Sequence, residues 1–332
     1  MELTVRLGKR SYPIYLEKGV LQKASQHIRL NRKVLIVTDS GVPKQYSETV
    51  ASQCKAPVVV TVPAGESSKS FVCLQQLCTV MLEHSFSRKD CVVAVGGGVV
   101  GDLAGFAASV YMRGIDFYNI PTTTLSQIDS SVGGKTAVNL GGVKNIVGAF
   151  HQPKAVLVDP DTLKTLPQRH YNNGLMEALK AGLIADKELF DLFAGGNVAA
   201  SIETVLYRAL EMKRKVVEAD ETEQGLRKIL NFGHTIGHGI ESAGRLGALY
   251  HGECVALGML PMITDPDLRT ATAQIIESLG LDPCTPYDKE KVFAALTKDK
   301  KAHDGQITVV LVDKAGTSRL EDVTLEQLQQ RL

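Results

Sequence analysis

The fold of this chain is decided by the stretch Cys91-Val92-Val93-Ala94-Val95-Gly96-Gly97-Gly98-Val99-Val100-Gly101-Asp102. Its apolar first part is typical of a short buried strand, which runs directly into three consecutive glycines. Glycines in this position let backbone N–H groups approach a phosphate closely, and the next helix offers its N-terminus to the anion. The spacing is not the G-x-G-x-x-G fingerprint, so a tight turn with close helix–strand packing is the alternative interpretation.

Strands and helices alternate around this turn. β-branched runs cover residues 34–39, which end in the turn residue Asp39, and residues 57–62, and helical patterns cover residues 70–85 and 103–110. Such alternation predicts a parallel sheet covered by helices on both faces.

The second half of the chain has a different pattern. From Tyr171 onward the periodicity is helical, apart from a strand-like run at residues 307–311, and Pro167 interrupts the pattern between the halves. We therefore expect an α/β domain over residues 1–166 and a helical domain over residues 167–332.

Composition excludes several classes of protein. The chain has 332 residues with 44% apolar content, which is ample for a core, and its net charge of +1 gives no reason to expect a nucleic-acid partner. The six cysteines form no C-x-x-C pair, which indicates reduced thiols. No run is long enough to span a membrane and the N-terminus carries no apolar signal core, so we expect a cytoplasmic protein.

Polar loops in the first half suggest a small anionic substrate. Residues 129–136, Asp-Ser-Ser-Val-Gly-Gly-Lys-Thr, combine hydroxyls, glycines and one lysine, as phosphate-cradling loops do. Lys144 and Asn145 follow a second pair of glycines. A solvated surface loop is the alternative. In the loop at residues 65–70, a helix-capping role is the simplest interpretation for Ser67 and Ser68 taken alone.

Histidines gather in the second half. His234 and His238 stand four apart, which places both imidazoles on one helix face, and His251 follows shortly after. Imidazole suits zinc, and a catalytic zinc site needs three protein ligands. However, H-x-x-x-H without the glutamate of H-E-x-x-H is a weak motif, and surface histidines are the alternative.

Two further helical spacings accompany the histidines. Glu177 and Lys180 lie at i, i+3 in an otherwise apolar stretch, where an unpaired charge would be costly. Glu223, Arg227 and Asn231 lie at i, i+4 and i+8, which predicts one helix face leading into the histidine segment.

Taken together, the chain resembles the 3-dehydroquinate synthase family. The motifs that carry the resemblance run through nearly the whole chain: residues 65–70, 96–102, 111–114, 121–123, 129–136, 144–145, 177 with 180, 227 with 230–238, 251–253 and 299–301. The resemblance implies an N-terminal Rossmann-like α/β domain that binds NAD, an all-α C-terminal domain, one divalent metal (zinc or cobalt) and a homodimer. It also implies conversion of 3-deoxy-D-arabino-heptulosonate 7-phosphate to 3-dehydroquinate and phosphate, in the shikimate pathway of aromatic amino-acid biosynthesis.

The same resemblance assigns site residues. The metal ligands would be Glu177, His234 and His251. The substrate-binding and catalytic residues would be Arg113 (entering from the partner subunit), Asp129, Lys135, Asn145, Lys180, Lys213, Arg227, Asn231, His238 and Lys300. The NAD-binding residues would be Asp39, Glu66, Lys69, Gly96, Gly97, Gly98, Asp102, Thr122, Thr123, Lys144 and Thr165.

Some features depart from the family pattern, and some alternatives remain. Gly41 stands where the family often has asparagine, residues 260–267 look shortened, and Lys301 could take the role assigned to Lys300. Another sugar-phosphate cyclase, of the aminodehydroquinate or deoxy-inosose synthase type, is one rival. A metal-dependent polyol dehydrogenase is another, although the many Lys and Arg residues suited to a phosphate argue against it.

Overall fold

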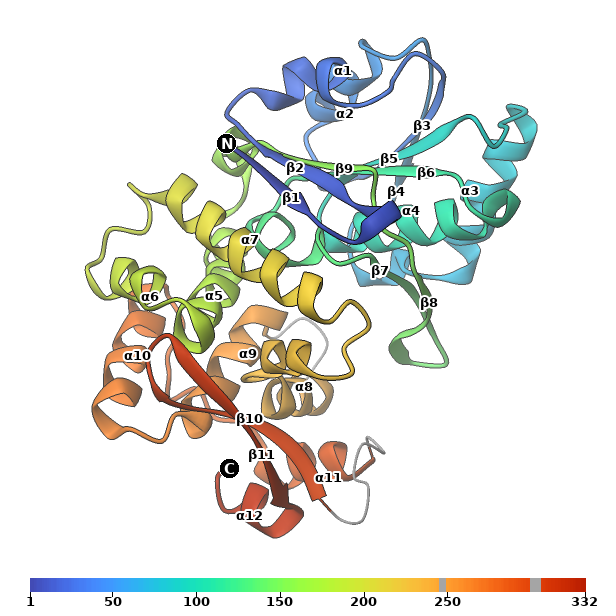
Figure 1. Cartoon of the computed structure of the whole chain (residues 1–332). Helices are drawn as coiled ribbons and strands as arrows, with labels where there is room; N and C mark the ends of the chain where they lie inside the picture. Colours follow the sequence, from blue (N-terminus) through green and yellow to red (C-terminus); the bar gives the residue numbers. More distant parts are fainter. Residues whose placement is uncertain (245–248, 299–305) are drawn as a thin grey trace. The chain divides into compact units, whose positions relative to one another are not determined.

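The computed structural model describes residues 1–244, 249–298 and 306–332 (Figure 1). The chain divides into two compact units. The first comprises Met1–Pro167 with Lys213–Glu218, and the second comprises Gln168–Met212 with Ala219–Leu332. Residues 213–218, which we expected in the second domain, group with the first unit.

The first unit is built on a seven-stranded sheet with strand order β1-β2-β9-β6-β5-β3-β4. The strands are β1 (Glu2–Val5), β2 (Tyr12–Leu16), β3 (Lys33–Asp39), β4 (Ala56–Val62), β5 (Cys91–Gly96), β6 (Asp116–Pro121) and β9 (Ala155–Val158). All neighbours pair in parallel except β1 with β2. The predicted parallel sheet and its three predicted strands are therefore confirmed.

Helices cover both faces of this sheet, and β5 shows why its sequence is apolar throughout. The helices are α1 (Ala24–His27), α2 (Lys44–Ala51), α3 (Phe71–Glu83) and α4 (Gly98–Val110). Val92 and Ala94 of β5 pack in a core shared with α3 and α4, while Val93 and Val95 pack in a second core with α2. A strand buried on both faces reads as a continuous apolar run.

The strand order creates a switch point at the carboxyl edge of the sheet. β3 pairs with β4 on one side and with β5 on the other, so the chain leaves β3 and β5 in opposite directions. Ligands of open α/β sheets bind in the crevice at such a point. Asp39 and the glycine turn stand there, at the ends of β3 and β5.

A separate hairpin of β7 (Lys135–Leu140) and β8 (Val143–Phe150) completes the first unit (Figure 1). It packs against α3 and α4. The hairpin carries three residues of the expected site. Lys135 is the first residue of β7, and Lys144 and Asn145 lie in β8.

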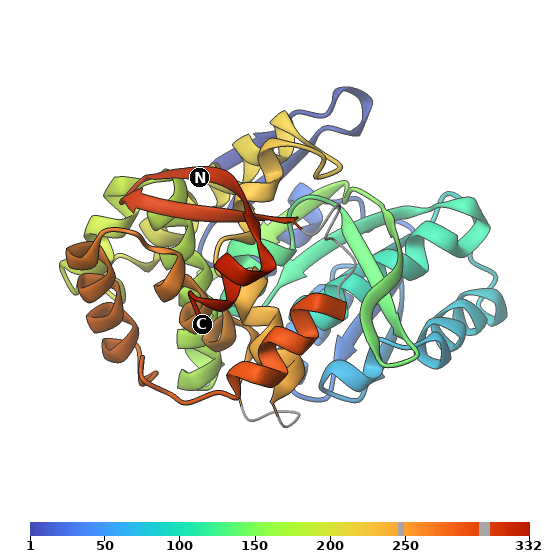
Figure 2. The ribbon, with the colours of Figure 1, turned by 90° about the horizontal axis from the view of Figure 1, so that it is seen from below.

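The second unit is mainly helical. Its helices are α5 (Gln168–Ala185), α6 (Lys187–Ala194), α7 (Ile202–Ala219, whose last part belongs to the first unit), α8 (His234–Ala243), α9 (His251–Met259), α10 (Pro266–Ser278), α11 (Lys289–Lys298) and α12 (Leu325–Gln329). A hairpin of β10 (Gln306–Lys314) and β11 (Thr317–Thr324), red in Figure 2, is added to them. The sequence indicated only its first strand. The Gly316 N–H donates to the Leu183 carbonyl at 2.9 Å, which ties the hairpin turn to α5. Within the described ranges, none of the helices combines the length and apolar character that crossing a membrane requires.

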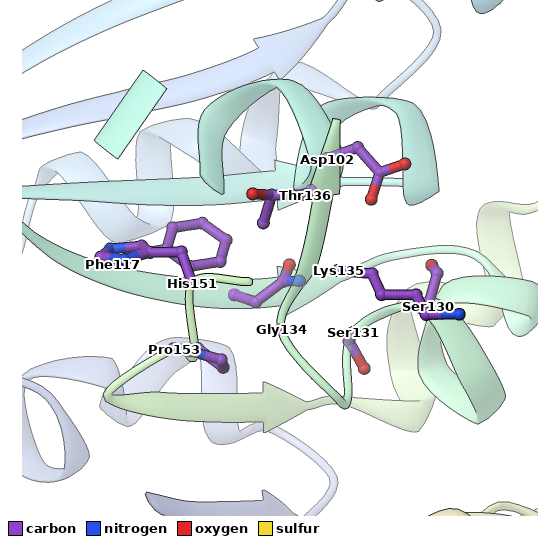
Figure 3. Close-up of a pocket in the computed structure, with 11 residues that line it drawn as sticks. Asp102, Phe117, Ser130, Ser131, Gly134, Lys135, Thr136, His151 and Pro153 are labelled. Atoms are coloured by element: carbon purple, nitrogen blue, oxygen red, sulfur yellow. The ribbon is translucent and has the colours of Figure 1, made fainter. Parts of the chain in front are cut away.

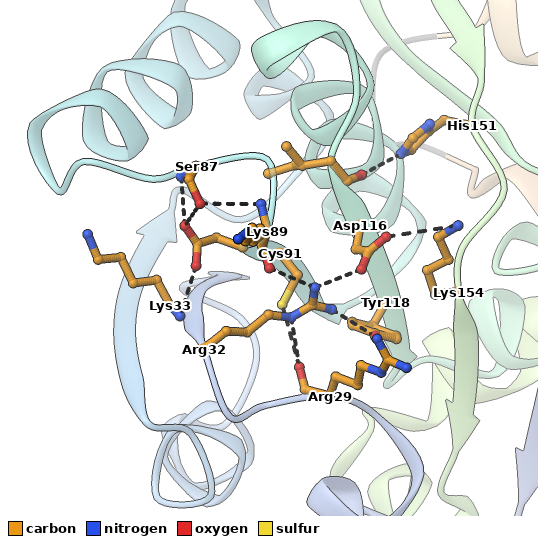
Figure 4. Close-up of polar contacts among 12 residues, drawn as sticks. Arg29, Arg32, Lys33, Ser87, Lys89, Cys91, Asp116, Tyr118, His151 and Lys154 are labelled. Carbon is orange, nitrogen blue, oxygen red and sulfur yellow. Dashed lines mark hydrogen bonds and ion pairs between the residues drawn. The ribbon is translucent and has the colours of Figure 1, made fainter.

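Arg32 fastens the amino ends of three parallel strands (Figure 4). Its Nη1 donates to Asp116 Oδ2 at 2.7 Å and to the Lys89 carbonyl at 3.0 Å, and its Nη2 donates to the Tyr118 hydroxyl at 2.9 Å. Arg32 leads into β3, Lys89 leads into β5, and Asp116 begins β6. One guanidinium therefore links three segments that are distant in sequence.

We expect Arg32→Ala to lower the free energy of unfolding of the first unit by about 1.5–3 kcal/mol, because hydrogen bonds to a charged group are lost together. Equilibrium urea unfolding followed by circular dichroism measures this. Arg32→Lys should fall between, since a single ammonium cannot reach all three partners. Arg29→Ala, which removes an exposed arginine nearby, is the control. Equal effects at Arg29 and Arg32 would contradict the assignment.

Candidate active site

The glycine turn presents bare backbone at the switch point. α4 begins at Gly98, with Gly97 at its N-cap position and no side chain capping it. A Cβ on Gly97 would lie 3.2 Å from Thr123 Cγ2, and one on Gly98 would lie 3.0 Å from Ser130 Oγ. The loop after β6 thus faces the turn so closely that side chains would not fit easily. A helix N-terminus without a side-chain cap, flanked by glycines, fits the diphosphate of a dinucleotide.

Lys69 organises the polar groups beside this turn. Its buried ammonium lies 2.6 Å from Asp102 Oδ2 on α4 and 3.7 Å from Glu66 Oε1, and it also donates to Asn145 Oδ1. Burial raises the pKa of Asp102 above its ordinary value, and Lys69 offsets part of that rise. The resemblance assigned Glu66, Lys69 and Asp102 to NAD and Asn145 to the substrate, and the structure brings all four together.

The three threonines assigned to NAD have different hydrogen-bond partners. The Thr122 N–H donates to the Gly96 carbonyl at 2.9 Å, which joins the loops after β5 and β6. Thr123 Oγ1 lies 2.9 Å from Ser126 Oγ. Thr165, at the end of the 3-10 segment Pro160–Thr165, donates its hydroxyl to the Thr162 carbonyl and lies 2.8 Å from the Tyr46 hydroxyl.

Asp129 and Lys213 meet within the first unit although 84 residues separate them. Asp129 lies in the π-helical turn Ser126–Ser130, and the Lys213 ammonium contacts its Oδ1. Lys135 is exposed at the start of β7, and with Asp102, Ser130 and Ser131 it lines a small pocket beside α4 (Figure 3). A lysine and a carboxylate that line a pocket suit an anionic substrate that also exchanges protons.

In the second unit, Glu177 of α5 is the centre of a buried cluster. Its Oε1 lies 3.6 Å from His234 Nε2 and 3.5 Å from His251 Nε2, and the Lys180 ammonium contacts its Oε2. Glu177 is only 2% exposed, so its charge depends on the Lys180 ammonium and on the two imidazoles that surround it. A buried carboxylate needs compensating positive charge, and a metal ion between Oε1 and the imidazoles would add to the charge of Lys180.

The two histidines present the atoms that such a cation would bind. His234 Nδ1 lies 3.1 Å from the Phe232 carbonyl, so this nitrogen carries the proton and the neutral ring turns the lone pair of Nε2 toward Glu177. His251 Nδ1 lies 3.3 Å from Glu241 Oε2. One carboxylate oxygen and two Nε2 atoms therefore converge on one point, while the Nδ1 atom of each ring contacts a second oxygen that orients the ring. This arrangement fits a divalent metal such as zinc.

The pKa shifts of the cluster also indicate a site that favours positive charge. Burial would raise the pKa of Glu177, but Lys180 and the histidines outweigh burial and hold it well below its ordinary value. Burial and Lys180 lower the pKa of His234. Burial also lowers that of His251, yet hydrogen bonds to Glu177 and Glu241 raise its pKa to about 9. A proton on His251 thus supplies charge where a metal ion would.

His238 is exposed, and its ring centroid lies 5.2 Å from that of His234 and 5.8 Å from that of His251. The candidate ligand atoms of the three histidines all lie within 4.8 Å of one another. The geometry therefore admits two ligand sets: the three histidines, or Glu177 with His234 and His251.

Glycines allow the backbones of α8 and α9 to lie in direct contact, and this contact sets the distance between the histidines. A Cβ on Gly258 of α9 would lie 2.1 Å from the Gly233 carbonyl oxygen, and one on Gly237 of α8 would lie 2.9 Å from the Cys254 carbonyl oxygen. The backbones of α8 and α9 thus touch, which brings His234 and His251, the first residues of the two helices, to the same carboxylate.

The predicted continuous helix through Glu223, Arg227 and Asn231 is wrong. Glu223 has a φ of 63°, outside any helix, and the 3-10 segment Leu226–Asn231 follows it. Side-chain bonds replace the expected helix face: Asn231 Nδ2 donates to Glu223 Oε1 at 3.1 Å, and the buried Arg227 donates to the Glu221 carbonyl. Lys300 and Lys301 lie outside the described residues.

Sequence reasoning missed two residues that hold the cluster. Glu241 lies three residues after His238 on α8, a spacing that could have revealed it. Asn173 lies one turn before Glu177, and its Oδ1 accepts the N–H groups of Gly252 at 2.8 Å and Glu253 at 3.3 Å. Asn173 therefore fixes the start of α9, where His251 stands.

The glycine turn of the first unit fits a nucleotide phosphate, and the carboxylate–imidazole cluster of the second unit fits a divalent cation. The chain belongs to the 3-dehydroquinate synthase family. The family models for the 3-dehydroquinate synthase N-terminal and C-terminal parts match residues 59–173 and 174–302.

Known relatives cover the chain almost end to end. The 3-dehydroquinate synthase of Enterococcus faecalis (strain ATCC 47077 / OG1RF) is 40% identical over 99% of this chain and 98% of the relative. That of Alkaliphilus metalliredigens (strain QYMF) is 42% identical over 98% of this chain and 97% of the relative. The predicted family is thus confirmed.

Solved structures show the same fold. A 2-deoxy-scyllo-inosose synthase, complexed with carbaglucose-6-phosphate, NAD+ and Co2+, aligns with a TM-score of 0.89 at 25% identity, over 100% of this chain and 99% of that one. A 2-epi-5-epi-valiolone synthase from Streptomyces hygroscopicus subsp. jinggangensis 5008, with NAD+ and Zn2+ bound, aligns with a TM-score of 0.88 at 30% identity, over 98% and 97%. The predicted fold class, an α/β domain followed by a helical domain, is confirmed.

Proposed function

We propose that this chain is a 3-dehydroquinate synthase, which converts 3-deoxy-D-arabino-heptulosonate 7-phosphate to 3-dehydroquinate and phosphate. The observation that carries the proposal is the buried Glu177 cluster, in a chain that matches both parts of the family. Its carboxylate and two imidazoles offer a three-ligand set with room for substrate oxygens. The NAD+ with Co2+ or Zn2+ in two structural neighbours supports the same cofactors here.

When bound, NAD would supply reversible hydride transfer at C5 of the sugar, and a divalent metal would supply polarisation of the substrate oxygens. Glu177, His234 and His251 would hold the metal. The glycine turn 96–98 would hold the diphosphate of NAD. Other NAD contacts would come from Asp39, Glu66, Lys69, Asp102, Thr122, Thr123, Lys144 and Thr165.

Oxidation at C5 serves the elimination. A carbonyl at C5 makes the neighbouring C–H acidic, so that phosphate can leave. Reduction at C5 follows, the ring opens, and an intramolecular aldol step closes the carbocycle. The cofactor is regenerated in each turnover, and the overall reaction is a lyase reaction.

Charged side chains have separate tasks in this scheme. Lys135, Lys180, Arg227 and Lys300 would neutralise the carboxylate and phosphate of the substrate, which require cations at fixed positions. Asp129 and Lys213 form a pair able to exchange a proton with the substrate. Asn145 and Asn231 would orient its hydroxyls. His238, exposed beside the cluster, can change its charge as phosphate departs.

We expect NAD to act catalytically. Purified chain with the heptulosonate phosphate, substoichiometric NAD and zinc or cobalt should release phosphate and form 3-dehydroquinate in many equivalents per NAD. A hexose 6-phosphate, offered in parallel, should give neither product. Accumulation of NADH equal to the substrate consumed would move the chain to the dehydrogenase class.

The rival cyclases are less well supported than the synthase. Their structures superpose closely, but their identities of 25% and 30% lie below the 40–42% found with 3-dehydroquinate synthases. A glycerol dehydrogenase from Sinorhizobium meliloti 1021 aligns at 20% identity with a TM-score of 0.61, which supports only a shared fold.

We further propose a homodimer in which Arg113 enters the partner's site. Met112 and Arg113 both adopt positive φ angles, 49° and 66°, a costly conformation that functional positions tend to retain. Both are exposed at the end of α4. The hairpin packed on α4 also exposes apolar side chains: Leu140, Val143, Ile146 and Phe150. Several exposed apolar side chains on one hairpin are typical of an interface.

Mixing two inactive variants tests the shared site. Chains carrying Arg113→Ala and chains carrying Lys135→Ala should each be inactive, and the mixture should regain activity because one site of each heterodimer is intact. Subunit exchange is followed with differently tagged chains. Exchange without recovered activity would place Arg113 in the site of its own chain.

A further inference from the structure

Asn139 lies where the β7–β8 ladder is interrupted. The pairing register shifts between Val138 and Leu140, so Asn139 alone stands opposite residues 144–146 of β8. Inserted residues of this kind bend a strand and re-aim its side chains, and they are frequent beside active sites. Here the inserted stretch contains Asn145, which the proposed function assigns to the substrate.

Asn139 forms hydrogen bonds that replace the interrupted ladder. Its Oδ1 accepts the N–H of Asn145 at 2.8 Å, which holds Asn145 in the left-handed region at a φ of 57°. Its Nδ2 donates to Glu66 Oε1 at 2.8 Å, and its own N–H donates to the Lys69 carbonyl at 2.8 Å. One residue thus joins the inserted stretch of β8 to the segment after β4.

Lys69 closes the network from the other side. Its ammonium, in a side chain that is 5% exposed, donates to Asn145 Oδ1 and to Asp102 Oδ2. Asn145 is therefore held twice, through its backbone N–H by Asn139 and through its side chain by Lys69. Glu66, Lys69 and Asp102 are proposed NAD contacts, so the substrate residue and the NAD residues form one hydrogen-bonded set.

We propose that Asn139 is a positioning residue that fixes the NAD-binding segment and the substrate-binding hairpin relative to each other. The proposal rests on the function proposed above for these loops. Asn139 supplies both a donor and an acceptor from one short side chain, which neither aspartate nor alanine can do. An asparagine that only stabilised the hairpin would change the stability of the chain and leave the affinity for NAD unchanged.

The test measures the dissociation constant of NAD by calorimetry, the KM for the heptulosonate phosphate, and amide exchange over residues 139–147. Asn139→Ala should weaken NAD binding about 10-fold and speed exchange at Asn145, since both side-chain hydrogen bonds of Asn139 are lost together. Asn139→Asp should also weaken NAD binding, because it places a second carboxylate against Glu66. It should leave exchange at Asn145 slow, because an acceptor remains.

A double variant separates positioning from general damage. In Asn139→Asp combined with Glu66→Gln, the amide at position 66 can donate to the carboxylate at position 139. We expect the double variant to bind NAD with a higher affinity than the sum of the two single-variant losses in binding free energy would predict. Asn197→Asp, at an exposed position of the other unit, controls for the added charge.

The outcomes distinguish the two proposals. Unchanged NAD affinity and KM in both Asn139 variants, or no recovery in the double variant, would overturn the role of Asn139 while the synthase remains active. The expected NAD shifts in a chain that never releases phosphate would support Asn139 and contradict the proposed function. A parent chain that binds no NAD would contradict both. If Asn139→Ala fails to fold, Asn139→Asp and the double variant decide.

Discussion

Glu177→Gln is expected to remove the bound divalent metal and with it the turnover. Glutamine keeps the shape of the side chain but loses the negative charge that His234 and His251 face at 3.6 and 3.5 Å. Changes to residues that only support a metal ligand cost 10–100-fold in affinity, so loss of a ligand should cost about 10-fold or more. His234→Ala and His251→Ala should behave alike. Metal analysis after dialysis, followed by titration with zinc or cobalt, measures the loss.

His238→Asn is the matched comparison. It should keep its metal and lose turnover, because we assign His238 to the departing phosphate and not to the metal. The opposite pattern, metal loss in His238→Asn with full retention in His251→Ala, would restore the simple i, i+4 ligand pair.

Gly258→Ala should be among the most destabilising single changes in the second unit. The added Cβ would lie 2.1 Å from the Gly233 carbonyl oxygen and 2.7 Å from the Gly237 nitrogen, so α8 and α9 would have to separate. Overpacking of this kind costs about 1–3 kcal/mol and sometimes more, and here the contact atoms are backbone, which cannot turn aside. Chemical unfolding and metal affinity should both report the change, because separating the helices also separates His234 from His251.

Gly225→Ala is the control for this substitution. Its nearest neighbour would be Asp220 Oδ2 at 3.8 Å, an ordinary contact. A Gly258→Ala chain that keeps parental stability and metal affinity would show that α8 and α9 are not in the contact described here.

Local chemistry in the sequence was enough to predict the sheet and the glycine turn. β5 is apolar because it is buried on both faces of the sheet. Glycines directly after a buried strand indicate a tight turn between that strand and the next helix. The i, i+3 spacing of Glu177 and Lys180 likewise indicated their contact, because helix geometry converts spacing into proximity.

Contacts between distant segments could not be predicted in this way. Asp129 and Lys213 meet because α7 delivers Lys213 to the first unit, and no spacing rule spans 84 residues. The expected helix through Glu223 failed because helical spacing is necessary for a helix but not sufficient, and Asp220 instead accepts the N–H groups of Gln224 and Gly225. Asn139 carried no motif, since its role depends on a shift of register between two strands.

The two outer strands of the large sheet have a consequence for how the protein behaves in a crowded solution. An open strand edge is a template on which other chains can add strands and aggregate. β1, at one edge, has only four residues, and β4, at the other, contains Pro57, which has no N–H to offer an incoming strand. Both margins of the sheet are therefore poor templates, and partly folded copies of this chain have little opportunity to extend one another's sheets.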